Sequence, residues 1–378
     1  MAQFRVGMIG CGRPWRMEGA KGTGIGNVHA NGYTASPDCE IVAAADLDQS
    51  NLDSFCRTHH IANGYQSHKE MLEKENLDIV GVTLGPSLHA QLVIDAARAG
   101  VKAVHCEKPM AMTWGDARKM AAVCEENGVQ LTFNHQRRYS APYAKAKELL
   151  DAGAIGKLTR VDACCPDLLH WGTHWFDIMM FYNHDEPAAW VMGQMEARGG
   201  YGGREAAEGQ GVSYFLWKNG VYGLMMGQKP PYEFANRLIG TEGMIEVPWL
   251  FTDQGEIRMM NKESKGEWQS IDCWWNDKNY SPEIFATAAL LDKTIPGHFW
   301  TQHYAWTGSI AAGIFDLVDA LKNGREPEMS VRKSLQATEL VFATMESSRR
   351  RGRVDLPLEI EDNPFMSMLE AGDISLEG

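Results

Sequence analysis

The sequence predicts two domains: an α/β domain built on a parallel sheet, then an α+β domain with a large, open, mostly antiparallel sheet. In the first third of the 378 residues, short runs rich in Val, Ile and Ala alternate with segments that carry helix signals, as in right-handed βαβ units. After about residue 135, strand-like runs follow one another through short turns, which indicates antiparallel pairing. The chain is also longer than one ordinary core requires.

Five strands are expected in the parallel half, each a short apolar run. Helix signals lie between them: Ser67 and Glu70 have the spacing of a capping box. Gly100 and Gly128 stand where a left-handed residue would end a helix. The expected strands are Phe4–Ile9, Glu40–Ala45, Asp78–Leu84, Lys102–Cys106 and Gln130–Phe133.

The second half mixes helices with hairpins. Helices are expected over Ser140–Leu150 and His170–Tyr182, and Asn219-Gly220 between two apolar runs predicts a hairpin with a type I′ turn. Further strands are expected at 237–239, 244–247, 257–260 and 268–273, with closing helices at 305–321 and 331–349. The expected domains are therefore 1–135 and 136–360, followed by an acidic, poorly patterned tail at 361–378.

Composition excludes several classes of partner. The formal net charge of −13 argues against nucleic acid, since binding to phosphates needs clustered Lys and Arg. No uninterrupted apolar stretch reaches the length of about 18 residues that a membrane span requires. The eight cysteines show no CxxC pair and no regular framework, and the sequence shows no signal peptide. We therefore expect reduced thiols in a cytoplasmic protein.

The first strand ends in Gly10-Cys11-Gly12. Glycines at this point allow a tight turn and let backbone N–H groups approach a pyrophosphate. The third glycine of a GxGxxG pattern is missing, because Trp15 stands in its place. Residues 13–24 look like an insertion, after which Gly26 is the candidate third glycine. An ordinary Gly-rich turn is the alternative to an α/β Rossmann domain.

Charged residues near this turn suggest how a cofactor would be held. The inserted segment carries Arg13, Arg16 and Lys21, which either reach the cofactor or substrate or lie on a solvated loop. Asp46 ends the second strand, where a carboxylate can accept hydrogen bonds from the adenosine ribose and would repel a 2′-phosphate. The expected cofactor is therefore NAD rather than NADP.

The fourth of these strands is followed by Glu107-Lys108-Pro109. Side chains at the carboxyl edge of a parallel sheet point into the ligand crevice. Lys108 is therefore placed to stabilise a developing alkoxide or to share in proton transfer. Glu107 is placed to pair with it or to bind the nicotinamide ribose. An exposed Glu-Lys pair on the surface is the plain alternative.

These motifs resemble, in their order, the glucose-fructose oxidoreductase/inositol dehydrogenase/MocA (Gfo/Idh/MocA) family. The resemblance covers nearly the whole chain and implies an NAD(P)-binding Rossmann domain and an open-sheet domain that often mediates oligomers. It also implies a sugar, cyclitol or related substrate, with Lys108 as the catalytic lysine, His174 as its histidine partner and His89 among the cofactor contacts. A homodimer or homotetramer is expected. The matching residues are Gly10-Cys11-Gly12, Asp46, Thr83…Pro86…His89, Glu107-Lys108-Pro109, Asn134…Arg138, Gly172–Asp177 and Gly240-Thr241-Glu242-Gly243.

One departure from the family concerns His170, which stands where the family commonly has Asp. His170 and His174 at i, i+4 would share one helical face. That spacing also suits a metal with Asp167 or Cys165 as third ligand, but the expectation is no metal. Contact with substrate or tuning of His174 is favoured over a packing role.

A second departure is Thr83-Leu84-Gly85-Pro86 in place of the family's Thr-Pro-Asn, which removes an Asn contact to cofactor. The residues expected to bind substrate are His170, Asp167, Trp171 and Arg138.

The expected reaction is oxidation of a substrate hydroxyl by NAD. His174 would accept the hydroxyl proton, which suits its ordinary pKa near 6.5, while Lys108 stabilises alkoxide character on the same oxygen. An NAD-dependent glycosidase is the main alternative, in which transient ring oxidation is followed by elimination, water addition and hydride return. A non-catalytic NAD-binding sensor is a third possibility, which the presence of both Lys108 and His174 disfavours.

Overall fold

The computed structural model describes residues 3–12, 24–197, 210–227, 234–249, 256–273 and 304–375. The chain divides into two compact units. The first comprises Met1–Ala111, Arg118–Tyr139 and Trp275–Arg332, and the second comprises Met112–Ala117, Ser140–Trp274 and Lys333–Gly378.

The first unit contains a six-stranded sheet in the order β3-β2-β1-β4-β5-β6, and all its pairs are parallel. The five predicted strands are all present, and only β3, a three-residue strand with two exposed residues, was missed. This sheet confirms the predicted α/β Rossmann architecture. The strands are β1 (Phe4–Ile9), β2 (Cys39–Ala45), β3 (Asn63–Tyr65), β4 (Ile79–Val82), β5 (Ala103–Cys106) and β6 (Gln130–Phe133).

The helices of this unit begin and end where the sequence signals lie. The Ser67 side chain caps its helix by accepting from the Glu70 N–H at 3.4 Å, and Gly100 and Gly128 have φ values of +83° and +65°. These caps confirm the predicted boundaries. The helices are α1 (Ile25–Ala35), α2 (Gln49–His59), α3 (His68–Lys74), α4 (Pro86–Arg98), α5 (Trp114–Glu126), the 3-10 turn η1 (Gln136–Tyr139) and α9 (Tyr304–Asn323).

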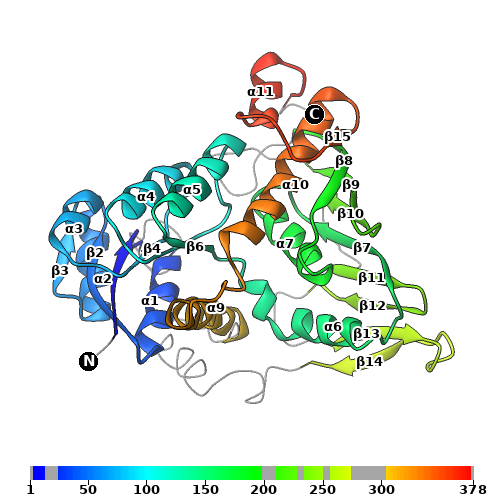
Figure 1. Ribbon diagram of the computed structural model, residues 1–378, viewed down its shortest axis with the longest axis horizontal. Coiled ribbons are helices and arrows are strands. Elements are labelled where there is room, and N and C mark those ends of the chain that lie inside the picture. Colours follow the sequence, from blue (N-terminus) through cyan, green and yellow to red (C-terminus); the bar gives the residue numbers. More distant parts are fainter. Residues whose placement is uncertain are drawn as a thin grey trace. The chain divides into compact units, whose positions relative to one another are not determined.

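The late helix α9 belongs to the first unit, beside α1 (Figure 1). Its Ile310, Ile314 and Leu317 are fully buried in the same core as Val28 and Tyr33 of α1. The compact units therefore do not follow the single boundary expected at 135/136, because the chain returns to cover the parallel sheet after the second sheet is built.

The second unit contains a nine-stranded sheet in the order β14-β13-β12-β11-β7-β10-β9-β8-β15. Every pair is antiparallel except β7 with β10, which is parallel. The predicted mostly antiparallel sheet is confirmed, although β7, β8 and β15 were not foreseen. The strands are β7 (Leu158–Cys165), β8 (Ala188–Met195), β9 (Gly211–Trp217), β10 (Tyr222–Gly227), β11 (Asn236–Gly240), β12 (Gly243–Val247), β13 (Glu256–Asn261), β14 (Gln269–Asp272) and β15 (Val354–Asp355).

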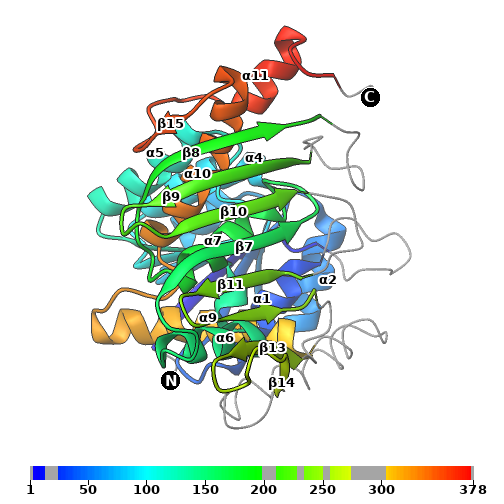
Figure 2. The same ribbon diagram turned by 90° about the vertical axis from the view of Figure 1, so that its right-hand side faces the viewer.

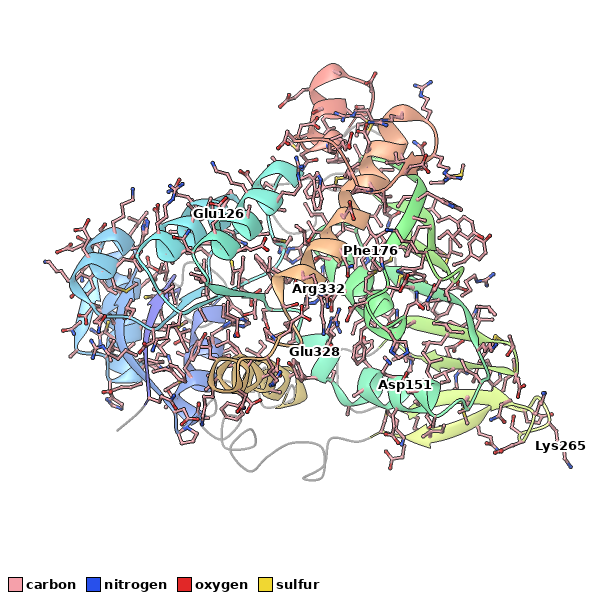
Figure 3. The ribbon with its side chains drawn as sticks, in the orientation of Figure 1. Glu126, Asp151, Phe176, Lys265, Glu328 and Arg332 are labelled. Carbon is pink, nitrogen blue, oxygen red and sulfur yellow. The ribbon has the colours of Figure 1, made fainter. Side chains whose placement is uncertain are left out.

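One face of this sheet packs against helices, while Figure 2 shows the other face with no described helix of the unit over it. On the covered face, Phe176 of α7 (labelled in Figure 3) packs against Phe215 of β9 with ring centroids 5.9 Å apart. The open face confirms the predicted open sheet. The helices of this unit are α6 (Ala141–Asp151), α7 (Gly172–Tyr182), α10 (Val331–Arg350) and α11 (Pro364–Ala371).

The hairpin predicted at Asn219-Gly220 is present between β9 and β10, but its turn type was wrong. The tight turn is closed by the Gly220 N–H, which donates to the Trp217 carbonyl at 2.9 Å. Of the two predicted central residues only Gly220, at φ +87°, has positive φ, whereas a type I′ turn needs both. The Asn219 side chain instead accepts from the Val221 N–H at 3.2 Å.

The tail predicted at 361–378 is also wrong for residues 364–371, which form α11. Asn363 caps this helix by accepting from the N–H groups of Phe365 and Met366, and its own amide donates to the Met112 carbonyl at 2.8 Å. Phe365 and Met368 are 1% and 3% exposed. The two buried apolar side chains and the Asn363 cap explain why this acidic segment forms a helix with a buried side.

Replacing Phe365 by Ala should therefore lower the free energy of unfolding by about 3 kcal/mol, the usual effect of removing a buried aromatic ring. Chemical denaturation followed by circular dichroism measures this change. The exposed Glu370→Ala on the same helix is the matched control and should leave stability unchanged. A wild-type value for Phe365→Ala would show that α11 is not packed.

Candidate active site

The glycine turn after β1 has the geometry of a dinucleotide loop. Gly10 has a φ of +97°, a conformation that side chains rarely permit. A Cβ at Gly26 of α1 would lie 2.5 Å from the Gly10 carbonyl oxygen. The helix therefore approaches the turn closely because position 26 has no side chain, which is the role predicted for the third glycine.

The start of α1 fits a phosphate. Gly24, at φ +69°, is the N-cap residue and has no side chain to cap the first turn, so the N–H groups there favour an anion. Gly12, the second predicted glycine, accepts a hydrogen bond on its carbonyl from the Asn27 amide at 3.0 Å. The predicted contacts from Arg13, Arg16 and Lys21 lie outside the described residues.

Asp46 lies beside the same turn. Its Oδ2 accepts from the Cys11 N–H at 2.7 Å, and its Oδ1 accepts from the Asp48 N–H at 2.8 Å. These bonds fix the carboxylate at the carboxyl end of β2. Within the described residues each oxygen accepts one backbone hydrogen bond and keeps a further lone pair, so the group fits the two hydroxyls of an adenosine ribose.

Glu107 is a buried carboxylate with three hydrogen-bond donors. It is 7% exposed, and its Oε1 accepts from His29 Nε2 at 2.8 Å and from Asn134 Nδ2 at 2.7 Å. Its Oε2 accepts from the Lys108 N–H at 3.1 Å. Burial alone would raise the pKa of this carboxyl, but His29, the Lys108 charge and Asn134 lower it to about 2. The carboxylate is therefore ionised at neutral pH.

This network fixes the backbone that carries Lys108, which directly follows β5 and is half-buried. Glu107 accepts hydrogen bonds from three protein N–H groups, and its predicted contact with cofactor stays a prediction. Its partner His29 was not predicted from the sequence. The available signal was position: His29 follows Gly26 by one helical turn, on the face of α1 that is buried against the sheet.

A second buried histidine, His105, lies next to His29 with ring centroids 5.1 Å apart. Its Nδ1 is 2.8 Å from the Thr132 hydroxyl. Burial, together with the neighbouring His29, lowers the pKa of His105 to about 3. The ring is therefore neutral, and it adds no positive charge beside the Glu107 network.

Two of the predicted contact residues prove to be enclosed. His89 is 0% exposed, with Nδ1 2.9 Å from the Pro109 carbonyl oxygen and Nε2 3.1 Å from that of Leu84. Burial lowers its pKa, and a neutral ring donates to only one of these two oxygens. His89 thus ties the loop after β4 to the loop that carries Lys108.

Arg138 is the other enclosed residue. Its side chain is 0% exposed and pairs with Glu328 (labelled in Figure 3) at 2.8 Å. This burial within the first unit does not support the predicted contact of Arg138 with substrate.

The remaining predicted residues lie in the second unit, around the start of α7. The helix begins at Gly172, so the expectation that His170 and His174 share a helical face is wrong: His170 lies in the preceding turn. The reason is Asp167, whose Oδ1 accepts from the Trp171 N–H at 2.7 Å and holds this turn outside the helix. His174 lies within α7 and is 3% exposed.

Three tryptophans gather beside this turn. Trp175 stacks on Trp249 with centroids 5.0 Å apart and planes 18° apart. Trp171 lies 6.1 Å from Trp175 and 6.3 Å from Trp249. Trp249 was not predicted, because it reaches α7 only through the pairing of β12 with β11 and of β11 with β7. Its indole N–H donates to the Cys164 carbonyl at 3.1 Å.

The described residues contain no group of three or more His, Cys, Asp or Glu side chains arranged to hold a metal. Within the same part of the chain, no helix has both the length and the apolar character to cross a membrane.

Comparison with known proteins shows which proteins this chain is similar to. Residues 4–135 match the sequence profile of the Gfo/Idh/MocA oxidoreductase family, NAD-binding Rossmann fold. The chain is similar to D-apiose dehydrogenase of Paraburkholderia graminis, with 33% identity over 41% of this chain and 38% of that enzyme. It is also similar to rhizopine catabolism protein MocA of Rhizobium meliloti, with 25% identity over 69% of this chain and 83% of that protein.

Among solved structures, the WlbA dehydrogenase of Bordetella pertussis in complex with NADH and UDP-GlcNAcA has the same fold. The TM-score is 0.70 at 22% identity, covering 95% of this chain and 99% of that one. Several curated relatives are matched over only about half of their length or less. Residues 4–135 therefore form an NAD-binding Rossmann domain similar to that of the Gfo/Idh/MocA oxidoreductases.

Adding a methyl group at Gly26 should weaken NAD binding about tenfold or more, because it would press on the Gly10 carbonyl and displace the turn; a tenfold loss corresponds to about 1.4 kcal/mol. Calorimetric titration of Gly26→Ala with NAD measures the effect. Gly352→Ala is the control, since a Cβ there would meet no atom nearer than 3.9 Å. Unchanged affinity for Gly26→Ala would remove this turn from the cofactor site.

Proposed function

We propose that the chain is an NAD-dependent oxidoreductase that acts on a hydroxyl of a sugar, cyclitol or sugar derivative. The observation that carries this proposal is Lys108, placed at the carboxyl end of β5 in an NAD-binding domain with its backbone tied to the buried Glu107. Relatives named D-apiose dehydrogenase and myo-inositol 2-dehydrogenase support the substrate class.

Asp46 supports NAD over NADP. Both of its oxygens accept hydrogen bonds from backbone N–H groups beside the glycine turn. These bonds hold the carboxylate in one orientation. A 2′-phosphate on the adenosine ribose would meet this fixed negative charge.

Lys108 and His174 are proposed as the residues that handle the substrate proton. When bound, NAD supplies the hydride acceptor. The Lys108 ammonium hydrogen-bonds the substrate oxygen and stabilises negative charge as the O–H bond breaks. His174 takes the released proton on its imidazole. Support for this pairing comes from the order of the motifs, which resembles that of the family.

Around His174, we assign substrate recognition to His170 and Trp171, both only partly buried in the turn before α7. The Trp171 ring supplies an aromatic face for the apolar face of a sugar ring. Asp167 holds this turn through the Trp171 N–H. Glu107 and His89 position the loop of Lys108.

Assembly as a homodimer or homotetramer is part of the proposal. The open face of the nine-stranded sheet carries large exposed side chains, among them Met192, Tyr214 and Tyr222 at 48%, 37% and 37% exposure. Exposed apolar patches of this kind favour protein contacts. The eight free cysteines support a cytoplasmic location.

A screen of sugars, cyclitols and glycosides with added NAD tests the function, with absorbance at 340 nm and product release followed together. Substrate-dependent accumulation of NADH is the expected result. Glycoside cleavage without accumulating NADH would replace the proposal by an NAD-dependent hydrolase, and NAD binding without any turnover would indicate a sensor.

Lys108→Ala should reduce turnover of the substrate so identified about 100-fold or more, the usual contribution of a group that handles a reacting proton. NAD affinity should change little, because Lys108 is assigned to the substrate oxygen. Lys102→Ala is the control: this lysine precedes β5, its side chain is 60% exposed, and it pairs with Asp78. Turnover equal to wild type in Lys108→Ala would exclude the lysine from the reaction.

A further inference from the structure

Two side chains that were not among the predicted site residues, Asn27 and His59, connect the glycine turn to the helices α1 and α2. Asn27, the third residue of α1, is 2% exposed. Its Nδ2 donates to the Gly12 carbonyl at 3.0 Å, and its Oδ1 lies 2.9 Å from Nε2 of His59, the last residue of α2. The glycine turn, α1 and α2 are thereby joined by two consecutive hydrogen bonds.

The direction of both bonds is fixed by chemistry. The Gly12 carbonyl oxygen only accepts, so Asn27 must present its NH₂ group to Gly12. Its Oδ1 then faces His59, and His59 must carry a proton on Nε2 in order to donate. Burial, with a smaller contribution from His60, lowers the pKa of His59 to about 4, so the ring is neutral near pH 7 with that proton on Nε2.

We propose that Asn27 and His59 form a clamp that orients the Gly12 carbonyl and so prepares the glycine turn for the pyrophosphate of NAD. A phosphate at this turn is recognised by backbone N–H groups. A carbonyl oxygen that rotated toward the phosphate would oppose its negative charge. With its carbonyl held on the Asn27 amide, Gly12 cannot rotate in this way. Asn27 and His59 are therefore positioning residues, and neither touches the cofactor.

Glycine makes such a clamp necessary. Gly10 and Gly12 give the turn its tight path and close approach, but glycine backbones also have the most freedom to adopt other conformations. On the other side of the turn, the Cys11 N–H is fixed by Asp46 at 2.7 Å. The Asn27 amide supplies the matching restraint on the carbonyl of Gly12.

The test is calorimetric titration of the full chain with NAD and, separately, with ADP-ribose, in the absence of any sugar. In Asn27→Asp, an oxygen replaces the donor that faces the Gly12 oxygen, so both ligands should bind about tenfold more weakly, as expected when a donor becomes a repelling acceptor. Asn323→Asp, an exposed change of the same kind on α9, is the charge control and should bind as wild type.

A second pair of variants separates the clamp from general packing. In His59→Leu the donor to Asn27 is lost, and both ligands should bind about fivefold more weakly, corresponding to about one net hydrogen bond. In His59→Gln the amide NH₂ replaces the imidazole donor, so affinity should return to within about twofold of wild type. If Asn27→Asp does not fold, the comparison of His59→Leu with His59→Gln tests the clamp on its own.

Wild-type affinity in Asn27→Asp, or equal losses in His59→Leu and His59→Gln, would overturn the clamp. The inference rests only on NAD binding within the proposed function. A chain that binds NAD through the clamp yet oxidises no sugar would overturn the proposed activity and leave the clamp intact, so the two failures are distinguishable.

Discussion

A buried, ionised carboxylate organises the first unit. Glu107 accepts hydrogen bonds from the His29 side chain of α1, from the Asn134 side chain just after β6 and from the backbone N–H of Lys108. A charge that is 7% exposed is costly unless it is fully paired. Pairing it requires α1, β5 and the end of β6 to meet at one point, and this requirement fixes the loop that carries the lysine.

The same helix links this carboxylate to the glycine turn. Within its first two turns α1 supplies Gly26, which allows close approach to Gly10, Asn27, which holds Gly12, and His29, which holds Glu107. The glycine turn and the loop that carries Lys108 are thus positioned by the same helix. A change in the position of α1 would disturb both together.

Local signals in the sequence predicted the parallel half well. Strand positions follow from short apolar runs, and the caps at Ser67, Gly100 and Gly128 follow from residue chemistry. Gly26 was identified despite the insertion because the helix pattern resumes there. His29 and Asn27 were missed, since their partners at 107 and 12 are set by how α1 packs and not by any local pattern.

In the second half, the errors arise where a side chain competes with regular structure. The Asp167 carboxylate accepts a hydrogen bond from the Trp171 N–H, and His170 lies in this turn outside α7. The Asn219 side chain accepts a hydrogen bond from the Val221 N–H, and the hairpin turn is not of type I′. The helix at 364–371 was not predicted because only two of its apolar side chains, Phe365 and Met368, are buried anchors, and the surrounding sequence is acidic. Long β7 and β8 were missed because their pairing partners lie up to about 160 residues away in sequence.

The most direct measurement is the steady-state rate of NADH formation by Glu107→Gln, with NAD affinity determined alongside. The Gln side chain keeps the shape and one acceptor oxygen for His29 and Asn134, but it presents an NH₂ group to the Lys108 N–H. If the ionised carboxylate fixes the lysine loop, turnover should fall about tenfold or more, since a charge-assisted hydrogen bond is replaced by two opposed donors. Wild-type turnover in a folded Glu107→Gln would contradict this account.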